Sequence, residues 1–199
     1  MGLSIHYSGN LRKASSLPSL IDEITEFCKV QKWKYNLFET KFKDDKFIDE
    51  TSFDNIYGII FTPPDCETIS VCFLSNAKMI SPISLEFWKN SQNENEKAWI
   101  YSVSVKTQFA GVKVHQLIIL FFRYLNEKYF ENFKMIDESN YWETNDVSIL
   151  QKQFEKYNSL LDNFEIAIQT KPMQEDEDII SYLKRLADNV DNYQNKKKK

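Results

Sequence analysis

The chain has 199 residues, of which 42% are hydrophobic, 15% aromatic and 27% charged, and its formal net charge is −4. This composition excludes collagen-like, intrinsically disordered and disulfide-scaffold proteins. Four basic residues form the C-terminal run 196–199, so the rest of the chain holds 21 basic against 29 acidic residues. A chain with this excess of acidic residues repels a phosphate backbone unless its basic residues gather on one face. We therefore do not expect nucleic acid as a partner.

Cysteine usage and the N-terminal segment predict a cytoplasmic protein. The three cysteines form no Cys-x-x-Cys pair, and the chain begins without the basic and apolar segments of a signal peptide. The longest apolar run, 117–122, is far shorter than the roughly 20 residues of a membrane span. The two histidines and the cysteine spacing predict no metal site, and the sequence lacks the common nucleotide-binding and hydrolase motifs, so no cofactor is expected.

The first half of the chain predicts several strands and one helix. Residues 2–8 alternate apolar and polar side chains, which predicts a strand that Gly9-Asn10 ends. A helix should follow from about residue 17, capped by Ser15 or Ser16, with Pro18 in its first turn. The spacing of its apolar residues predicts one buried face, made of residues 17, 20, 21, 24, 27 and 28. The remaining expectations are strands at 34–40, 57–62, 69–74 and 79–80, an exposed loop at 41–50, and turns at 63–65 and 75–78.

The second half predicts longer elements. The polar stretch 90–97 indicates a long loop or a boundary between half-domains, and the alternating segment 99–108 predicts the longest strand. A helix over 112–129 is apolar nearly all round and should be buried. The later expectations are a strand at 132–137, a helix at 147–168 capped by Asn145 or Asp146, an amphipathic helix at 174–191 and a disordered lysine tail at 196–199.

The order strand, helix, strand occurs twice with matching spacing, which indicates a pseudo-repeat of 1–90 and 98–168. We therefore predict an α+β fold. Its mostly antiparallel, curved sheet would be built from two strand-helix-strand units, with helices on one face and further C-terminal helices. We expect a single domain over 1–170, followed by a C-terminal amphipathic helix over 171–195.

Polar residues on the less apolar face of the predicted sheet are candidates for binding. His6 and Lys106 occupy comparable places in the two repeats, and an imidazole can serve as an acid or a base. The candidate ligand-binding residues are His6, Glu67, Lys106, Gln108, Trp142 and Glu143. Each also has a structural interpretation: a hydrogen-bonded or solvated side chain on a strand, a helix-stabilising acid, or, for Trp142, a packed loop anchor. We expect His115, in the buried helix, to be a hydrogen-bonded core residue.

Four segments resemble those of a family of uncharacterised bacterial proteins. They are Ser4-Ile-His-Tyr-Ser-Gly9 with its flanking Gly2-Leu3, Phe61-Thr-Pro-Pro-Asp-Cys-Glu67, Val103-Ser-Val-Lys-Thr-Gln-Phe-Ala-Gly111 and Tyr141-Trp-Glu-Thr144. The resemblance covers about residues 1–168. It implies a bacterial cytosolic origin and no particular activity.

Two functions of different classes stay open. The first is a non-catalytic binding or interaction module, of an accessory, immunity or defence type, that binds a protein partner or a small polar ligand. It would use the polar sheet face and the C-terminal helix. The alternative is a small hydrolase or transferase, with His6 as base, Lys106 as electrostatic stabiliser, and Glu67 or Glu143 as acid or orienting group. The sequence does not decide whether the protein is an enzyme, nor its oligomeric state.

Overall fold

The computed structural model describes residues 2–49 and 51–187, and the chain divides into two compact units, 1–150 and 151–199, which we describe separately. The strands are β1 (Ser4–Leu11), β2 (Lys34–Leu37), β3 (Tyr57–Thr62), β4 (Ile69–Phe73), β5 (Met79–Ile80), β6 (Val103–Lys106) and β7 (Phe130–Asp137). The α-helices are α1 (Leu17–Gln31), α2 (Pro82–Trp88), α3 (Glu94–Ala98), α4 (Gly111–Tyr129), α5 (Tyr141–Thr144) and α6 (Val147–Thr170). None of these described helices could cross a membrane, given their lengths and polarity.

The first unit is an α+β fold with antiparallel pairing, as predicted. The single expected sheet is in two parts, with strand orders β6-β1-β7 and β2-β3-β4-β5. An antiparallel bridge between Asn10 and Lys78 joins the two parts beside β5. The two expected repeats differ in connection, because β6 and β7 flank β1 in one sheet, whereas β1 and β2 lie in different sheets.

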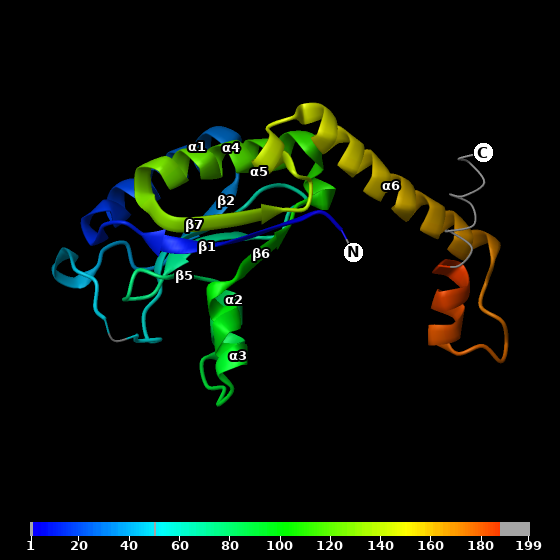
Figure 1. The fold of residues 1–199 in the computed structure, drawn as a ribbon, viewed down its shortest axis with the longest axis horizontal. Helices are drawn as coiled ribbons and strands as arrows, with labels where there is room; N and C mark the ends of the chain where they lie inside the picture. Colours follow the sequence, from blue (N-terminus) through cyan, green and yellow to red (C-terminus); the bar gives the residue numbers. More distant parts are fainter. Residues whose placement is uncertain (1, 50, 188–199) are drawn as a thin grey trace. The chain divides into compact units, whose positions relative to one another are not determined.

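Helices α1 and α4 lie on one side of the strands (Figure 1). Aromatic contacts join the two helices to each other and α4 to β1. The rings of Phe27 in α1 and Phe121 in α4 stack with centroids 3.9 Å apart. Phe122 of α4 lies 4.7 Å from the ring of Tyr7 in β1, on the buried side of that strand. The apolar spacing of α1 therefore predicted the right face, because helical periodicity places those residues in one stripe.

The expectation of helices on one face alone was wrong for the β2-β3-β4-β5 sheet. Every residue of β4 is buried. The far side of this sheet carries a second apolar cluster made of Cys72, Leu74, Ile80, Leu85 and Ile100, to which α2 and the turn after α3 contribute. Strands buried on both faces are mostly apolar, and β4 fits this except at Ser70, whose hydroxyl donates to the carbonyl of Ile80.

The region 82–108 differs most from its prediction. The expected loop at 90–97 contains α3, and α2 precedes it; Ser81 and Asn93 cap the two helices by accepting from the backbone N–H groups of Ser84 and Asn95. The expected long strand at 99–108 is reduced to the four residues of β6. Residues 99–101 and 108–110 form 3₁₀ turns instead, in which Ile100 and Gln108 are buried while Trp99 and Phe109 are exposed.

The sequence predicts that Gly9 and Asn10 end the first strand, but the strand continues past them. β1 continues to Leu11 past a bulge, where two residues of β7, Asn132 and Phe133, lie against Gly9. Asn132 takes a left-handed conformation with φ of 51°. The extra residue shifts the alternation of β7, so Phe130 and Phe133 both turn to the core.

Only one of the predicted N-terminal helix caps is confirmed. Asp146 accepts from the N–H of Ser148 at 2.7 Å, as expected for the start of α6. Ser16, by contrast, has helical backbone angles, and its hydroxyl donates to the carbonyl of Lys13. The expected exposed loop 41–50 is also anchored, because Phe42 is buried and stacks on Tyr57 with centroids 4.2 Å apart.

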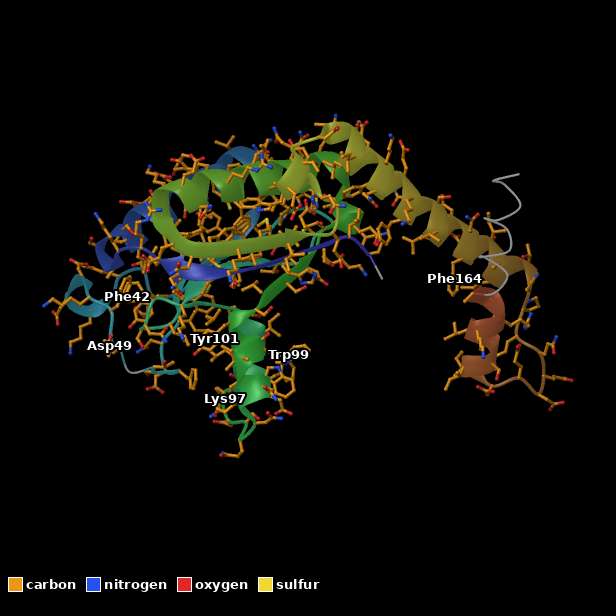
Figure 2. The ribbon with its side chains drawn as sticks, in the orientation of Figure 1. Phe42, Asp49, Lys97, Trp99, Tyr101 and Phe164 are labelled. Carbon is orange, nitrogen blue, oxygen red and sulfur yellow. The ribbon has the colours of Figure 1, made fainter. Side chains whose placement is uncertain are left out.

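The second unit contains most of α6 and a helix that begins at residue 179. This start lies later than the predicted 174, because residues 174–177 form a turn and Asp178 accepts from the N–H of Ile180. The side chains that pack together are Leu160, Phe164, Ala167, Tyr182 and Leu186; Figure 2 labels Phe164. Residues 188–191 and the lysine tail 196–199 lie outside the described part of the chain.

Candidate functional site

The side of the β6-β1-β7 sheet opposite α4 carries polar side chains, as the alternation predicted. We call this surface the open face. It consists of Ser4, His6 and Ser8 of β1, Ser104 and Lys106 of β6, and Lys134 and Ile136 of β7. Since each strand of the sheet contributes, pairing register decides which of these side chains are neighbours.

His6 lies at the middle of the open face. It is paired with Ser104 on one side and with Ile136 on the other, and its side chain is 38% exposed. The Nε2 atom of His6 is 3.8 Å from Oε1 of Glu138, and Oε2 of the same carboxylate accepts from the N–H of Ser4 at 2.7 Å. His6 is therefore accessible and faces an acidic neighbour that the sequence did not single out.

Lys106 is a diagonal neighbour of His6, because it pairs with Ser4 in the adjacent row. Its ammonium group lies 5.5 Å from the ring centre of Phe109, which is itself 63% exposed. The structure therefore brings His6 and Lys106 onto one surface, as the sequence predicted. A cation over an aromatic ring is held without a carboxylate, so the ammonium group stays available to solvent and to a partner.

Glu67 reaches this sheet by its edge. Its carboxylate accepts from the backbone N–H of Lys106 at 2.7 Å, and its own N–H donates to the carbonyl of Lys106 at 3.3 Å. These two bonds extend β6 like a short extra strand, so the carboxylate of Glu67 is used in the fold. Burial, followed by the neighbouring Glu67, raises the pKa of Cys66 to about 12, so this thiol is not a thiolate at neutral pH.

Gln108 does not lie on the open face, contrary to the prediction. The chain leaves β6 at Thr107 and enters a 3₁₀ turn, which leaves Gln108 only 4% exposed. A methyl group on Gly2 would overlap the Oε1 atom of Gln108 and the end of the Lys106 side chain, so both side chains would have to shift. The prediction failed because it assumed that strand alternation continued through residue 108.

Trp142 and Glu143 lie on α5, away from His6. The ring of Trp142 is 5.8 Å from that of Phe133 and 5.5 Å from the guanidinium of Arg123 in α4. Arg123 also donates to the carbonyl of Trp142 at 2.7 Å. Trp142 is therefore a packed anchor on the helix-covered side, and the exposed Glu143 follows it there.

A buried polar network joins α4 to the end of β7. The ring of His115 bonds the Thr107 hydroxyl at 2.7 Å through Nδ1 and the Ser139 hydroxyl at 3.0 Å through Nε2, and Nε2 is also 3.1 Å from a carboxylate oxygen of Asp137. All four residues are at most 2% exposed. His115 is thus a hydrogen-bonded core residue, as expected, whereas its three partners were missed.

Asp137 is the centre of this network. Its two oxygens accept from the N–H groups of Ser139, Tyr141 and Trp142 at 2.8 to 2.9 Å, which shapes the turn into α5. The residue types match a Ser-His-Asp triad, but the Ser139 hydroxyl donates to Asp137 at 2.8 Å and is wholly buried. The four side chains of Thr107, His115, Asp137 and Ser139 therefore have a structural role in this conformation, and we call them the polar clamp.

The free energy of unfolding should depend on this carboxylate at low pH. Burial acts to raise the pKa of Asp137, but hydrogen bonds from His115 and Ser139 outweigh it and lower the pKa to about 2. An unfolded aspartate titrates near ~3.9. Because the folded pKa is the lower one, the stabilisation is present above pH ~4 and is lost as the pH falls toward ~2.

We therefore expect the stability gap between the wild type and Asp137→Asn to narrow as the pH falls from ~4 to ~2, by roughly 2 kcal/mol. Urea unfolding of both proteins at a series of pH values measures this gap. Subtracting the unfolding free energy of the variant from that of the wild type at each pH removes the contributions of the carboxylates that both proteins share. A gap that is constant across the window would show that Asp137 titrates alike in the folded and unfolded chains.

No protein-family model, curated protein or solved structure matches the chain. The resemblance to an uncharacterised bacterial family therefore stays a prediction. The site is defined by geometry: an accessible sheet face around His6 and Lys106, with a sealed polar clamp on the other side of the same strands.

Proposed function

We propose that this chain is a non-catalytic protein-binding module whose contact surface is the open face. The observation that carries the proposal is the exposure of Ile136, 66%, and Phe109, 63%, beside the polar side chain of His6 and the charged side chain of Lys106. Large apolar side chains set among polar and charged ones are typical of a protein interface. A bacterial, cytosolic role as an accessory or immunity-type protein belongs to this proposal.

The second unit offers further apolar surface for such a role. On its last helix, Ile179, Ile180 and Leu183 are 59%, 74% and 44% exposed, while Tyr182 and Leu186 pack inward. The predicted apolar stripe of this helix is therefore divided, and only part of it contacts α6. A partner that contacts this helix would bury side chains that the unit leaves in solvent.

The alternative of a small hydrolase or transferase has less support. It requires the side chains of His6, Lys106 and a glutamate to converge around one substrate. Glu67 uses its carboxylate on the main chain of Lys106, and Glu143 follows Trp142 on the helix-covered side. The carboxylate close to His6 is that of Glu138, at 3.8 Å, on an exposed sheet surface.

We expect Ile136→Glu to lower binding of the native partner by about tenfold or more, because it places a charge where the face exposes a large apolar side chain. The measurement is quantitative affinity capture from lysate of the host cell with the full chain as bait. Ile83→Glu is the matched control, since Ile83 is 69% exposed on α2 and is not one of the residues of the open face.

Both isoleucines are exposed, so both variants should fold, which circular dichroism can check. A partner retained by Ile136→Glu would overturn the proposed surface. So would equal loss from the two variants. If the wild-type chain captures nothing reproducibly from its host, the binding function itself fails.

A further inference from the structure

A small hollow lies at one end of the open face, beside the bulge of β7. Its volume is about 230 Å³, and the side chains that give it its chemistry are Ser8, Asn10, Lys78, Tyr101, Asn132 and Lys134. Register places Ser8 opposite Lys134, and the bridge between the sheets places Asn10 opposite Lys78. Figure 2 labels Tyr101 where the segment of α2 and α3 meets the strands.

The two lysines of this hollow are not neutralised. Within residues 2–49 and 51–187, neither Lys78 nor Lys134 forms an ion pair, whereas several other lysines do: Lys29, Lys41, Lys89, Lys97 and Lys128. The ammonium group of Lys78 lies 5.3 Å from the ring centre of Tyr101. Glu131 pairs with Asn10 nearby, yet the hollow itself is lined by no carboxylate.

Three neutral donors complete the lining. The Ser8 hydroxyl and the amide groups of Asn10 and Asn132 make no intramolecular hydrogen bond in the described part of the chain. Asn132 is the bulged residue, with φ of 51°, and bulges commonly redirect side chains beside functional sites. Two cations and three neutral donors, drawn from both sheets, therefore surround one open volume.

We infer that this hollow binds the phosphate group of a small ligand. Two ammonium groups match the double negative charge of a phosphate monoester, and lysine binds phosphate as a point charge. Donors on several sides suit a tetrahedral group of oxygens better than a planar carboxylate. This inference goes beyond the proposed function, because it concerns a small anion and needs no protein partner.

The test uses the full-length, ¹⁵N-labelled chain titrated with inorganic phosphate at constant ionic strength. We expect saturable shifts in the amide signals of Ser8, Asn10 and Asn132. Lys78→Gln and Lys134→Gln should each weaken binding by about tenfold, since each removes one charge-assisted contact. Lys34→Gln is the matched control, because Lys34 is an exposed lysine on β2 and outside the hollow.

Three results would overturn the inference. The first is the absence of saturable shifts with phosphate. The second is equal weakening by all three lysine variants, which would indicate a general charge effect. The third is acetate binding at these signals as tightly as phosphate, which would assign the hollow to carboxylates. None of these results bears on Ile136→Glu, so the inference and the proposed function can fail separately.

Discussion

Replacing Asp137 by asparagine should lower the free energy of unfolding at neutral pH by about 3 to 5 kcal/mol. The substitution keeps the size and shape of the side chain, so the loss does not come from packing. One carboxylate oxygen accepts from Ser139 Oγ and from the N–H groups of Tyr141 and Trp142, and the other faces His115 and Ser139 N–H. The amide NH₂ of asparagine must replace one of these acceptors, and it then meets donors inside the core.

The neighbouring Glu138→Gln is the matched control for this measurement. Glu138 also accepts a backbone N–H and also faces a histidine, but its side chain is 40% exposed. Water can replace its contacts, so we expect a change of less than ~1 kcal/mol. Urea unfolding of both variants at neutral pH gives the comparison. Similar losses of unfolding free energy in the two variants would mean that burial adds little to the stabilisation by the Asp137 carboxylate.

Local patterns predicted the elements whose burial depends on near neighbours in sequence. The apolar spacing of α1 predicted its buried residues, and the turn at 75–78 connects β4 to β5 as expected. Such features follow from periodicity and turn chemistry, which a single segment carries by itself. The spacing of His6 and Lys106 in the two repeats likewise predicted that they would share a surface, and register confirms it.

The features that sequence reasoning missed depend on contacts between distant segments. The pattern Asp137-Glu-Ser139 before a short helix is a capping signal that the sequence carries locally. The contacts of Asp137 and Ser139 with His115, however, reach back to α4, and no local pattern indicates them. The placement of Trp142 depends on which side of the sheet α5 occupies, and a single segment does not carry that information. The bulge at Asn132 depends on the register between β1 and β7, which alternation within either strand leaves open.

Gly58→Ala should destabilise the fold by about 3 to 5 kcal/mol, which makes it the other large effect that we expect. Gly58 lies in β3 opposite Cys72, with φ of 126°, a conformation that residues with a Cβ rarely adopt. A methyl group there would overlap the carbonyl oxygen of Val71 and approach the Cα of Cys72 at 3.1 Å. Both obstacles are backbone atoms of a wholly buried strand, so relief requires the sheet to move.

Gly111→Ala separates the two causes of this loss. Gly111 also has a positive φ, 81°, but a Cβ there would meet nothing within 4 Å. The control therefore carries conformational strain without a collision, and we expect it to cost only about 1 to 3 kcal/mol. Chemical denaturation of the two variants measures the difference. Equal losses would show that backbone strain alone accounts for Gly58, and that β3 and β4 have room to separate. A clearly larger loss at Gly58 would show that these strands pack too closely there for any residue but glycine.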